Sequence, residues 1–310
     1  MALMKFWGNK RYYGLDFFLK QKFGEKVGKI NIDGGFTCPN RDGTISFDGC
    51  DFCSPRGSGD FCVEKSRSIT EQINTTIPVI KSKWPVDKFI AYFQAFTGTY
   101  ASVDILKAKY DEALSHKSVV GLAIATRPDC LSSEVLDLLS HYNEKKFLWV
   151  ELGLQTTNDD IGRKINRGYD LKVFDDALNN LKKRNIPVVP HIIFGLPGES
   201  EESMMNSISY ISEKKPFGMK IHQLLILKGT KLERLYLDGK IAYASRDNYI
   251  NLVAQAIGFL DENIVIHRVM ADASDENLIE PKWSREKILV LNGINKRLKE
   301  LNIYQGKNLS

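Results

Sequence analysis

The sequence predicts an α/β fold, a partial (β/α)6 barrel of the TIM type built from parallel strands, with extensions at both ends of the chain. Short apolar segments alternate along the 310 residues with segments of helical periodicity. Strands that are almost wholly apolar are typical of a parallel sheet covered by helices. Six such units in series favour a curled sheet or partial barrel over a short open sheet.

The strands and helices are expected in regular alternation. Ser132 and Asp170 stand where helix N-caps are needed to accept hydrogen bonds from the first turn. We expect strands at 29–32, 88–95, 119–125, 147–154, 186–194 and 218–226, with a seventh at 264–270. Helical patterns lie near 66–83, 100–115, 131–143, 170–184, 200–213 and 245–261.

The chain carries no linker, low-complexity segment or internal repeat, so we expect one domain over 1–310. It divides into an N-terminal extension (1–28), a barrel core (29–226) and a C-terminal extension (227–310) that closes the barrel. The composition is 43% hydrophobic and 26% charged, without a run of eighteen apolar residues or a signal-peptide pattern. A cytoplasmic protein with no membrane partner is therefore expected.

Polar and glycine-rich segments follow each expected strand. In a parallel α/β fold the loops after the strands meet at one edge, where active sites lie. A cysteine-rich loop follows the first strand, and FQAFTGTY, TRPDC, GLQTT, FGLPGES and LKGTKL follow the next five. The sequence therefore predicts a functional site at this edge.

Four of the five cysteines lie in the loop after the first strand, with the spacing Cys38-x11-Cys50-x2-Cys53-x8-Cys62. An odd, clustered set argues against a secreted disulfide framework and favours metal binding. If all four bind, a closed structural zinc site results. If three bind, an iron–sulfur cluster with one open iron position results. The spacing alone leaves both open.

The motifs together resemble the radical SAM superfamily, and most closely its YhcC-like branch, which is related to the elongator-type group. The resemblance rests on DGGFTCPNRDGT, YFQAFTGTY, ATRPD, LWVELGLQT, INRGYD, HIIFGLPGES and KIHQLLILKGT, and it spans residues 5–305. The eleven-residue gap between the first two cysteines departs from the superfamily's commonest spacing, C-x3-C-x2-C, but is typical of this branch.

The resemblance implies a [4Fe–4S] cluster held by Cys38, Cys50 and Cys53, with S-adenosylmethionine (SAM) on the open iron. One electron, from an external reductant of the flavodoxin or ferredoxin type, would then convert SAM into a 5′-deoxyadenosyl radical that abstracts hydrogen from substrate. Cys62 and Cys130 lie outside the cluster pattern and are expected to be packed thiols.

SAM requires partners for its ribose, its carboxylate and its adenine. Glu151 and Gln155 share one strand face and suit the ribose and amino groups, although Glu151 could instead be a buried acid paired with Arg or Lys. By resemblance, Arg167, expected on the next helix, meets the SAM carboxylate; the alternative is a surface arginine. The expected SAM-binding residues are Thr126, Arg127, Glu151, Gln155, Arg167, Gly195, Pro197 and Gly198, the last three in a turn that ends with Glu199.

Substrate-binding side chains are expected to point into the mouth of the barrel. Two aspartates in ADASDE, where the branch more often has GDG, could bind polyol or base N–H groups. The candidates are Gln94, Thr97, Tyr100, His191, His222, Gln223, Asp272 and Asp275.

The resemblance implies an enzyme, with a lyase acting on a small molecule as the expected reaction. The most specific expectation is a queuine lyase that releases 7-aminomethyl-7-deazaguanine from queuine, so that a deazapurine base is the favoured substrate. A YhcC-like enzyme of unassigned substrate, acting on tRNA for example, is the first alternative, although the net charge of +5 gives no strong RNA footprint. A zinc-stabilised α/β binding protein is the alternative of another class.

Overall fold

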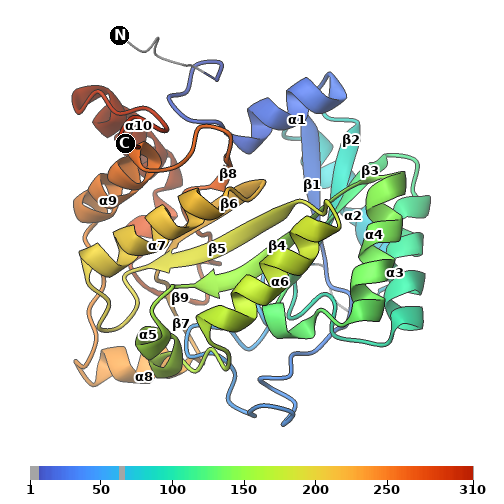
Figure 1. Cartoon of the computed structure of the whole chain (residues 1–310), viewed down its shortest axis with the longest axis horizontal. Coiled ribbons are helices and arrows are strands. Elements are labelled where there is room, and N and C mark those ends of the chain that lie inside the picture. Colours follow the sequence, from blue (N-terminus) through green and yellow to red (C-terminus); the bar gives the residue numbers. More distant parts are fainter. Residues whose placement is uncertain (1–6, 63–66, 310) are drawn as a thin grey trace.

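The computed structural model describes residues 7–62 and 67–309, and its centre is a curled sheet of seven parallel strands (Figure 1). Each strand pairs in parallel with the next, so the order in the sheet follows the chain. The strands are β1 (Val27–Ile32), β2 (Lys88–Phe93), β3 (Val119–Thr126), β4 (Phe147–Gln155), β5 (Val188–Phe194), β6 (Gly218–Gln223) and β8 (Val265–Arg268).

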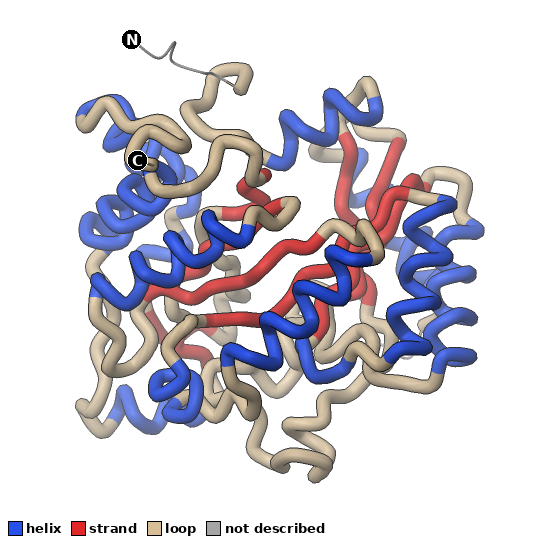
Figure 2. The backbone as a smooth tube through the Cα atoms, in the orientation of Figure 1, coloured by secondary structure: helices blue, strands red, loops and turns tan. Residues whose placement is uncertain are grey.

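Apolar side chains cover both faces of this sheet, which is why its strands are continuous hydrophobic segments. Inside the curl, Ile90, Ala123, Trp149 and Val189 pack together on neighbouring strands. The larger core lies between the outer face and the helices, which Figure 2 shows in blue on the outside of the sheet. The partial barrel that the sequence predicts is thus confirmed, with seven strands.

The helices that cover the outer face follow the strands in alternation. Both predicted N-caps are confirmed, since Ser132 accepts a hydrogen bond from Val135 N–H and Asp170 accepts one from Val173 N–H. These helices are α2 (Ile69–Lys81), α3 (Val103–Ser115), α4 (Ser133–Lys145), α6 (Leu171–Lys183), α7 (Glu201–Lys214) and α9 (Arg246–Gly258).

The remaining elements were not expected from the sequence. They are α1 (Leu15–Phe23), α5 (Asp159–Lys164), α8 (Lys231–Leu237), α10 (Lys287–Glu300) and the short 3₁₀ turns at Pro128–Cys130 and Lys282–Arg285. The first three have nine residues or fewer, too few for a clear periodicity.

Most predicted boundaries shift by one to three residues, and one predicted strand is divided. The strand expected at 218–226 ends at Gln223, and a separate strand, β7 (Ile226–Leu227), pairs antiparallel with β9 (Leu278–Glu280). The helix expected at 66–83 corresponds to α2, and its first expected residue, 66, lies outside the described residues.

Within the described residues, no helix is both long and apolar enough to cross a membrane.

The two ends of the described chain lie together near β8. Ile266 N–H donates to the Tyr13 carbonyl (2.7 Å), and Tyr13 N–H donates to Gln305 Oε1 (2.8 Å). Figure 1 shows α1, α10 and the C-terminus at the upper edge of the sheet, and the loop that carries the cysteines at the opposite edge. The carboxyl ends of the strands, where the sequence predicts the site, therefore stay clear of the terminal segments.

Candidate functional site

The cysteine loop follows β1, and no helix or strand forms between Asp33 and Cys62. Local hydrogen bonds shape it instead, among them Arg41 N–H to the Cys38 carbonyl (2.8 Å) and Cys53 N–H to the Cys50 carbonyl (3.0 Å). Cys38, Cys50 and Cys53 all line one cavity at the carboxyl edge of the sheet. The structure thus brings together the three cysteines that the resemblance selects.

Side chains of the same loop hold the cysteines in place. Asn40 Nδ2 lies 3.5 Å from Cys50 Sγ and donates to the Asn166 carbonyl (2.7 Å). Arg41 donates to the carbonyls of Cys53 (2.8 Å) and Ser54 (3.0 Å). Gly49 has φ +72°, and a Cβ there would lie 2.8 Å from Arg41 Nε, so glycine permits this close approach.

The three cysteines offer the donor set that a [4Fe–4S] cluster with one open iron position requires. Among the described residues, no three Cys, His, Asp or Glu side chains gather closely enough to hold one metal ion. A cubane cluster binds each thiolate at a different iron and therefore needs its sulfurs set apart. Burial, then the neighbouring Cys53, raise the pKa of Cys50 to about 12, so a cluster that binds there must displace a proton.

Cys62 and Cys130 do not line the cavity. Cys62 is buried, and burial raises the pKa of its thiol to about 12. Cys130 is the last residue of the 3₁₀ turn after β3, where its sulfur lies 3.5 Å from Asp129 Oδ1. Cys62 and Cys130 therefore lie outside the wall of the cavity that the other three cysteines share.

The cavity has a volume of about 490 Å³ and extends from the cysteines into the barrel. Its floor is formed by strand side chains rather than loops. Glu151 on β4 accepts hydrogen bonds from Trp149 Nε1 (3.1 Å) and from Lys220 Nζ on β6, and Lys220 also donates to the Tyr92 hydroxyl (3.2 Å). His191 Nε2 on β5 lies 3.0 Å from Glu151 Oε2. Four strands thus contribute to one buried polar cluster.

Glu151 is charged in this cluster. Burial alone would raise the pKa of the carboxyl, but the ammonium groups of Lys220 and Lys29 hold it well below its usual value. The structure therefore shows the alternative for Glu151, a buried acid paired with lysine. Because Glu151 also lines the cavity, its contact with the ribose or amino group of SAM stays a prediction.

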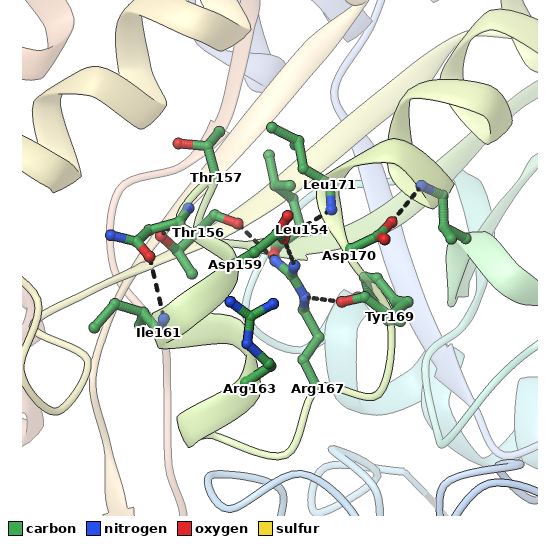
Figure 3. A network of polar contacts seen from close by, with 12 residues as sticks. Leu154, Thr156, Thr157, Asp159, Ile161, Arg163, Arg167, Tyr169, Asp170 and Leu171 are labelled. Atoms are coloured by element: carbon green, nitrogen blue, oxygen red, sulfur yellow. Dashed lines mark hydrogen bonds and ion pairs between the residues drawn. The ribbon is translucent and has the colours of Figure 1, made fainter.

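The predicted position of Arg167, on a helix and facing SAM, differs from its position in the structure. It lies between α5 and α6 rather than on a helix, is 1% exposed, and does not line the cavity. Its guanidinium donates to the carbonyls of Leu154 (2.8 Å), Thr156 (2.6 Å) and Tyr169 (2.9 Å) and to Asp159 Oδ1 (2.7 Å), as Figure 3 shows. Arg167 therefore braces the site from outside instead of pointing at SAM.

The turn after β5 also lies beside the cavity rather than in its wall. Gly195, Pro197 and Gly198 do not line the cavity, and Gly195 N–H points to Met204 Sδ (3.1 Å). Glu199 accepts hydrogen bonds from Thr156 Oγ1 and Ser203 Oγ, and burial raises its pKa to about 7. The prediction that these glycines approach adenine is thus unsupported by the lining of this cavity.

Three predicted SAM residues remain in the wall of the cavity: Thr126, Arg127 and Gln155. Arg127 forms a bidentate pair with Asp129 (2.9 and 2.6 Å) and donates to the Arg167 carbonyl (2.9 Å). Of the two arginines considered for SAM, only Arg127 lies beside the cysteines.

Six of the eight substrate candidates line the cavity, namely Gln94, Thr97, His191, His222, Gln223 and Asp272. Gln223 exchanges two hydrogen bonds with the backbone of Ala271 (2.8 and 3.0 Å), which fix the orientation of its amide. Tyr100 lies outside the cavity wall, where its hydroxyl is 3.0 Å from Thr44 Oγ1. Asp275 also lies outside it, paired with Arg285 (3.0 Å).

Sequence reasoning missed several lining residues, chiefly Tyr92, Tyr169, Lys220 and Arg268. The position of Lys220 in the cavity could have been predicted from the sequence. Side chains two residues apart on a strand share a face, and Lys220 precedes the candidate His222 by two residues. Arg268 and Tyr169 carry no comparable local signal, since their neighbours in the cavity are distant in the chain.

Two family models match this chain. The model described as the Radical SAM superfamily matches residues 37–211, and the model described as the Radical_SAM C-terminal domain matches residues 216–300. The first match includes the three cysteines and β2 to β5, and the second begins just before β6.

Two relatives match most of the chain. The uncharacterized protein YtqA of Bacillus subtilis (strain 168) is 43% identical over 298 residues, which cover 96% of this chain and 92% of YtqA. Protein YhcC of Escherichia coli (strain K12) is 35% identical over 266 residues, with 86% and 85% covered. The archaeal Methanocaldococcus infernus Elp3 structure has a TM-score of 0.65 at 18% identity, covers 90% of this chain and 64% of that chain, and so supports the fold.

Proposed function

Because the chain belongs to the radical SAM superfamily, we propose that it abstracts hydrogen from a small molecule held inside its barrel. Members of this superfamily bind a [4Fe–4S] cluster and SAM and require a reductant and a substrate. The observation that carries the proposal is that Cys38, Cys50 and Cys53 and the polar floor around Glu151 open onto one cavity. A substrate on that floor would lie within the same enclosed space as the cluster and SAM.

The residues of this chain have separate roles in the proposal. When bound, the cluster and SAM supply a 5′-deoxyadenosyl radical as the hydrogen acceptor. Cys38, Cys50 and Cys53 would hold three irons, and Arg127 and Gln155, in the wall beside them, would orient SAM. The barrel wall would exclude water, and the floor would position the substrate. A flavodoxin or ferredoxin type of protein is the proposed source of the electron.

A small molecule suits the cavity better than a polynucleotide, because about 490 Å³ must receive both SAM and the reacting group. Queuine remains one candidate substrate. Its support from the acidic loop is weak, because Asp272 is paired with Arg268 (3.2 Å) and Lys287 (2.9 Å) and Asp275 is paired with Arg285. An enzyme of the YtqA and YhcC type with a different substrate is thus favoured, and tRNA is its alternative substrate.

The test is anaerobic reconstitution with iron and sulfide, followed by chemical reduction in the presence of SAM. We expect a brown protein with four irons per chain that forms 5′-deoxyadenosine. A colourless protein with one zinc and no SAM cleavage would contradict the proposal and support the zinc-stabilised binding protein.

Substrate identification uses the same reduced enzyme in deuterated cell extract. A substrate transfers deuterium to 5′-deoxyadenosine, so mass spectrometry of that product follows the active fraction even while the substrate is unidentified. Queuine and unfractionated tRNA are added separately, and transfer from labelled tRNA but from no small-molecule fraction would overturn the small-molecule proposal.

A further inference from the structure

The floor of the cavity carries polar side chains that the chemistry at the cysteines does not use. Glu151, His191, Lys220, His222 and Arg268 lie there, on β4, β5, β6 and β8. Because all five are on strands, packing of the sheet sets their relative positions, and they form a rigid surface for a ligand.

The charged members of this floor are already paired. Glu151 binds Lys220, and Asp272 binds both Arg268 and Lys287. Lys29, whose Nζ lies 4.3 Å from the centre of the Tyr92 ring, also directs its charge toward Glu151, which raises the pKa of Lys29 against the lowering by burial. A charged ligand group would lose its hydration and find no free counter-charge among these residues.

The two imidazoles are the groups that remain available. Their ring centres are 5.4 Å apart, and burial lowers the pKa of both, that of His191 to about 4, so both are neutral at pH 7. His191 Nε2 is buried and lies 3.0 Å from Glu151 Oε2, but it makes no hydrogen bond there. His222 Nε2 is buried, and it has no hydrogen-bond partner among the described residues.

We propose that His191 and His222 form the part of the cavity that recognises the substrate. They would bind an uncharged polar molecule, such as an amide or a nitrogen heterocycle bearing N–H and carbonyl groups. This inference rests on the proposed function, since it takes the cavity to be the substrate site. The floor would select such molecules over analogues that carry a carboxylate or a phosphate, because only hydrogen-bonding partners are left unpaired.

The test is calorimetric titration of the anaerobic holoenzyme, with its cluster oxidised so that bound SAM is not cleaved. The probes are two pairs of similar ring size, nicotinamide against nicotinate and uracil against orotate. We expect the neutral member of at least one pair to bind at least tenfold more tightly than its acid. Equal or tighter binding of the acids, or no binding by any of the four, would overturn the proposal.

Variants of His222 test the residue assignment. His222→Phe keeps a ring but removes both nitrogens, and we expect it to weaken binding of the neutral probe about tenfold. His222→Gln, which retains a donor and an acceptor, should recover most of that loss, whereas the exposed His141→Phe should leave binding unchanged. Unchanged binding in His222→Phe, with iron content intact, would refute the assignment.

Measuring SAM cleavage in parallel keeps the two claims separable. Absence of 5′-deoxyadenosine would contradict the proposed function, whereas a holoenzyme that cleaves SAM yet prefers the acids would contradict only the inference about the floor.

Discussion

Glu151 is a residue whose chemistry depends on its neighbours across the barrel. On an isolated strand a glutamate at this position could serve the ribose of a cofactor. In the folded chain Lys220 on β6 reaches the same carboxylate, and burial makes an ion pair with a close partner the stable arrangement. The carboxylate is therefore paired within the protein, which is why the proposed ligand contacts are assigned to the histidines beside it.

The cysteines allow a direct test at the residue scale. Cys50→Ala should abolish cluster assembly, because it removes one of three thiolates that line the cavity. Cys62→Ala should keep full iron content, since Cys62 is buried outside the cavity wall. Iron and sulfide analysis after anaerobic reconstitution measures both. Loss of iron in Cys62→Ala would indicate a fourth protein ligand. It would contradict the prediction that three cysteines hold the cluster and that Cys62 is a packed thiol.

Glu199 provides a pH test. Burial raises its pKa from 4.5 to about 7, so the folded chain binds this proton more tightly than the unfolded chain. The resulting stability is fully present below pH 4.5 and is lost as pH rises through 7. Discounted for the partial exposure of Glu199, the loss should be about 1–2 kcal/mol.

Denaturant unfolding of the wild type and Glu199→Gln from pH 4.5 to 8 measures this loss as the difference between the two free energies of unfolding. Glu202→Gln, on the exposed side of α7, controls for removal of one surface charge. A difference that grows in favour of the wild type as pH rises would have the wrong sign for a buried, protonated Glu199.

At the scale of elements, one side chain joins three of them. Arg167 connects the end of β4, the first turn of α5 and the segment that leads into α6, and Asp159 Oδ1 also accepts Leu171 N–H (2.8 Å) (Figure 3). Each of these contacts uses a separate direction of the planar guanidinium. An ammonium group cannot reproduce that geometry.

Arg167→Lys should therefore lower the free energy of unfolding by about 2–4 kcal/mol, because buried carbonyls lose their donors. Arg163, which pairs with Asp160 on the surface of α5, provides the control. Arg163→Lys should change the free energy by no more than about 0.5 kcal/mol. If Arg167→Lys unfolds like the wild type but binds SAM poorly, the arginine contacts the cofactor after all.

The elements themselves were largely predictable. Apolar segments of four to nine residues between amphipathic helices identify a parallel sheet, because both sheet faces must be covered. The division of the strand expected at 218–226 was not predictable, because the partner of Ile226 and Leu227 is β9, some fifty residues later in the chain. Local periodicity carries no information about such pairing.

At the scale of the whole molecule, hydrogen bonds from the C-terminal segment hold the N-terminal segment against the barrel. Gln305 is 1% exposed, accepts Tyr13 N–H, and donates to the carbonyls of Asp261 (2.7 Å) and Ile264 (2.8 Å). Its backbone N–H also donates to the Arg11 carbonyl (2.9 Å). Residues almost three hundred positions apart thus share one buried amide beside β8.

Gln305→Ala should lower the free energy of unfolding by about 2–4 kcal/mol, since three backbone groups lose their partner. Gln255→Ala, on an exposed position of α9, should have almost no effect. Thermal or denaturant unfolding compares the two. A small loss in Gln305→Ala would show that water replaces the amide and that the ends are held mainly by packing.

The sequence by itself determined the fold class, the edge at which the site lies and the three cysteines that converge there. The fold class and the edge follow from hydrophobic periodicity and loop composition, whereas the choice of three cysteines rests on the family resemblance, because their spacing alone leaves three or four ligands open. Only the tertiary structure decided that Glu151 binds Lys220, that Arg167 braces the loops, and that His191 and His222 are left with free hydrogen-bonding groups. Those outcomes depend on which side chains meet across the barrel, and burial makes each of them sensitive to partners that lie on other strands.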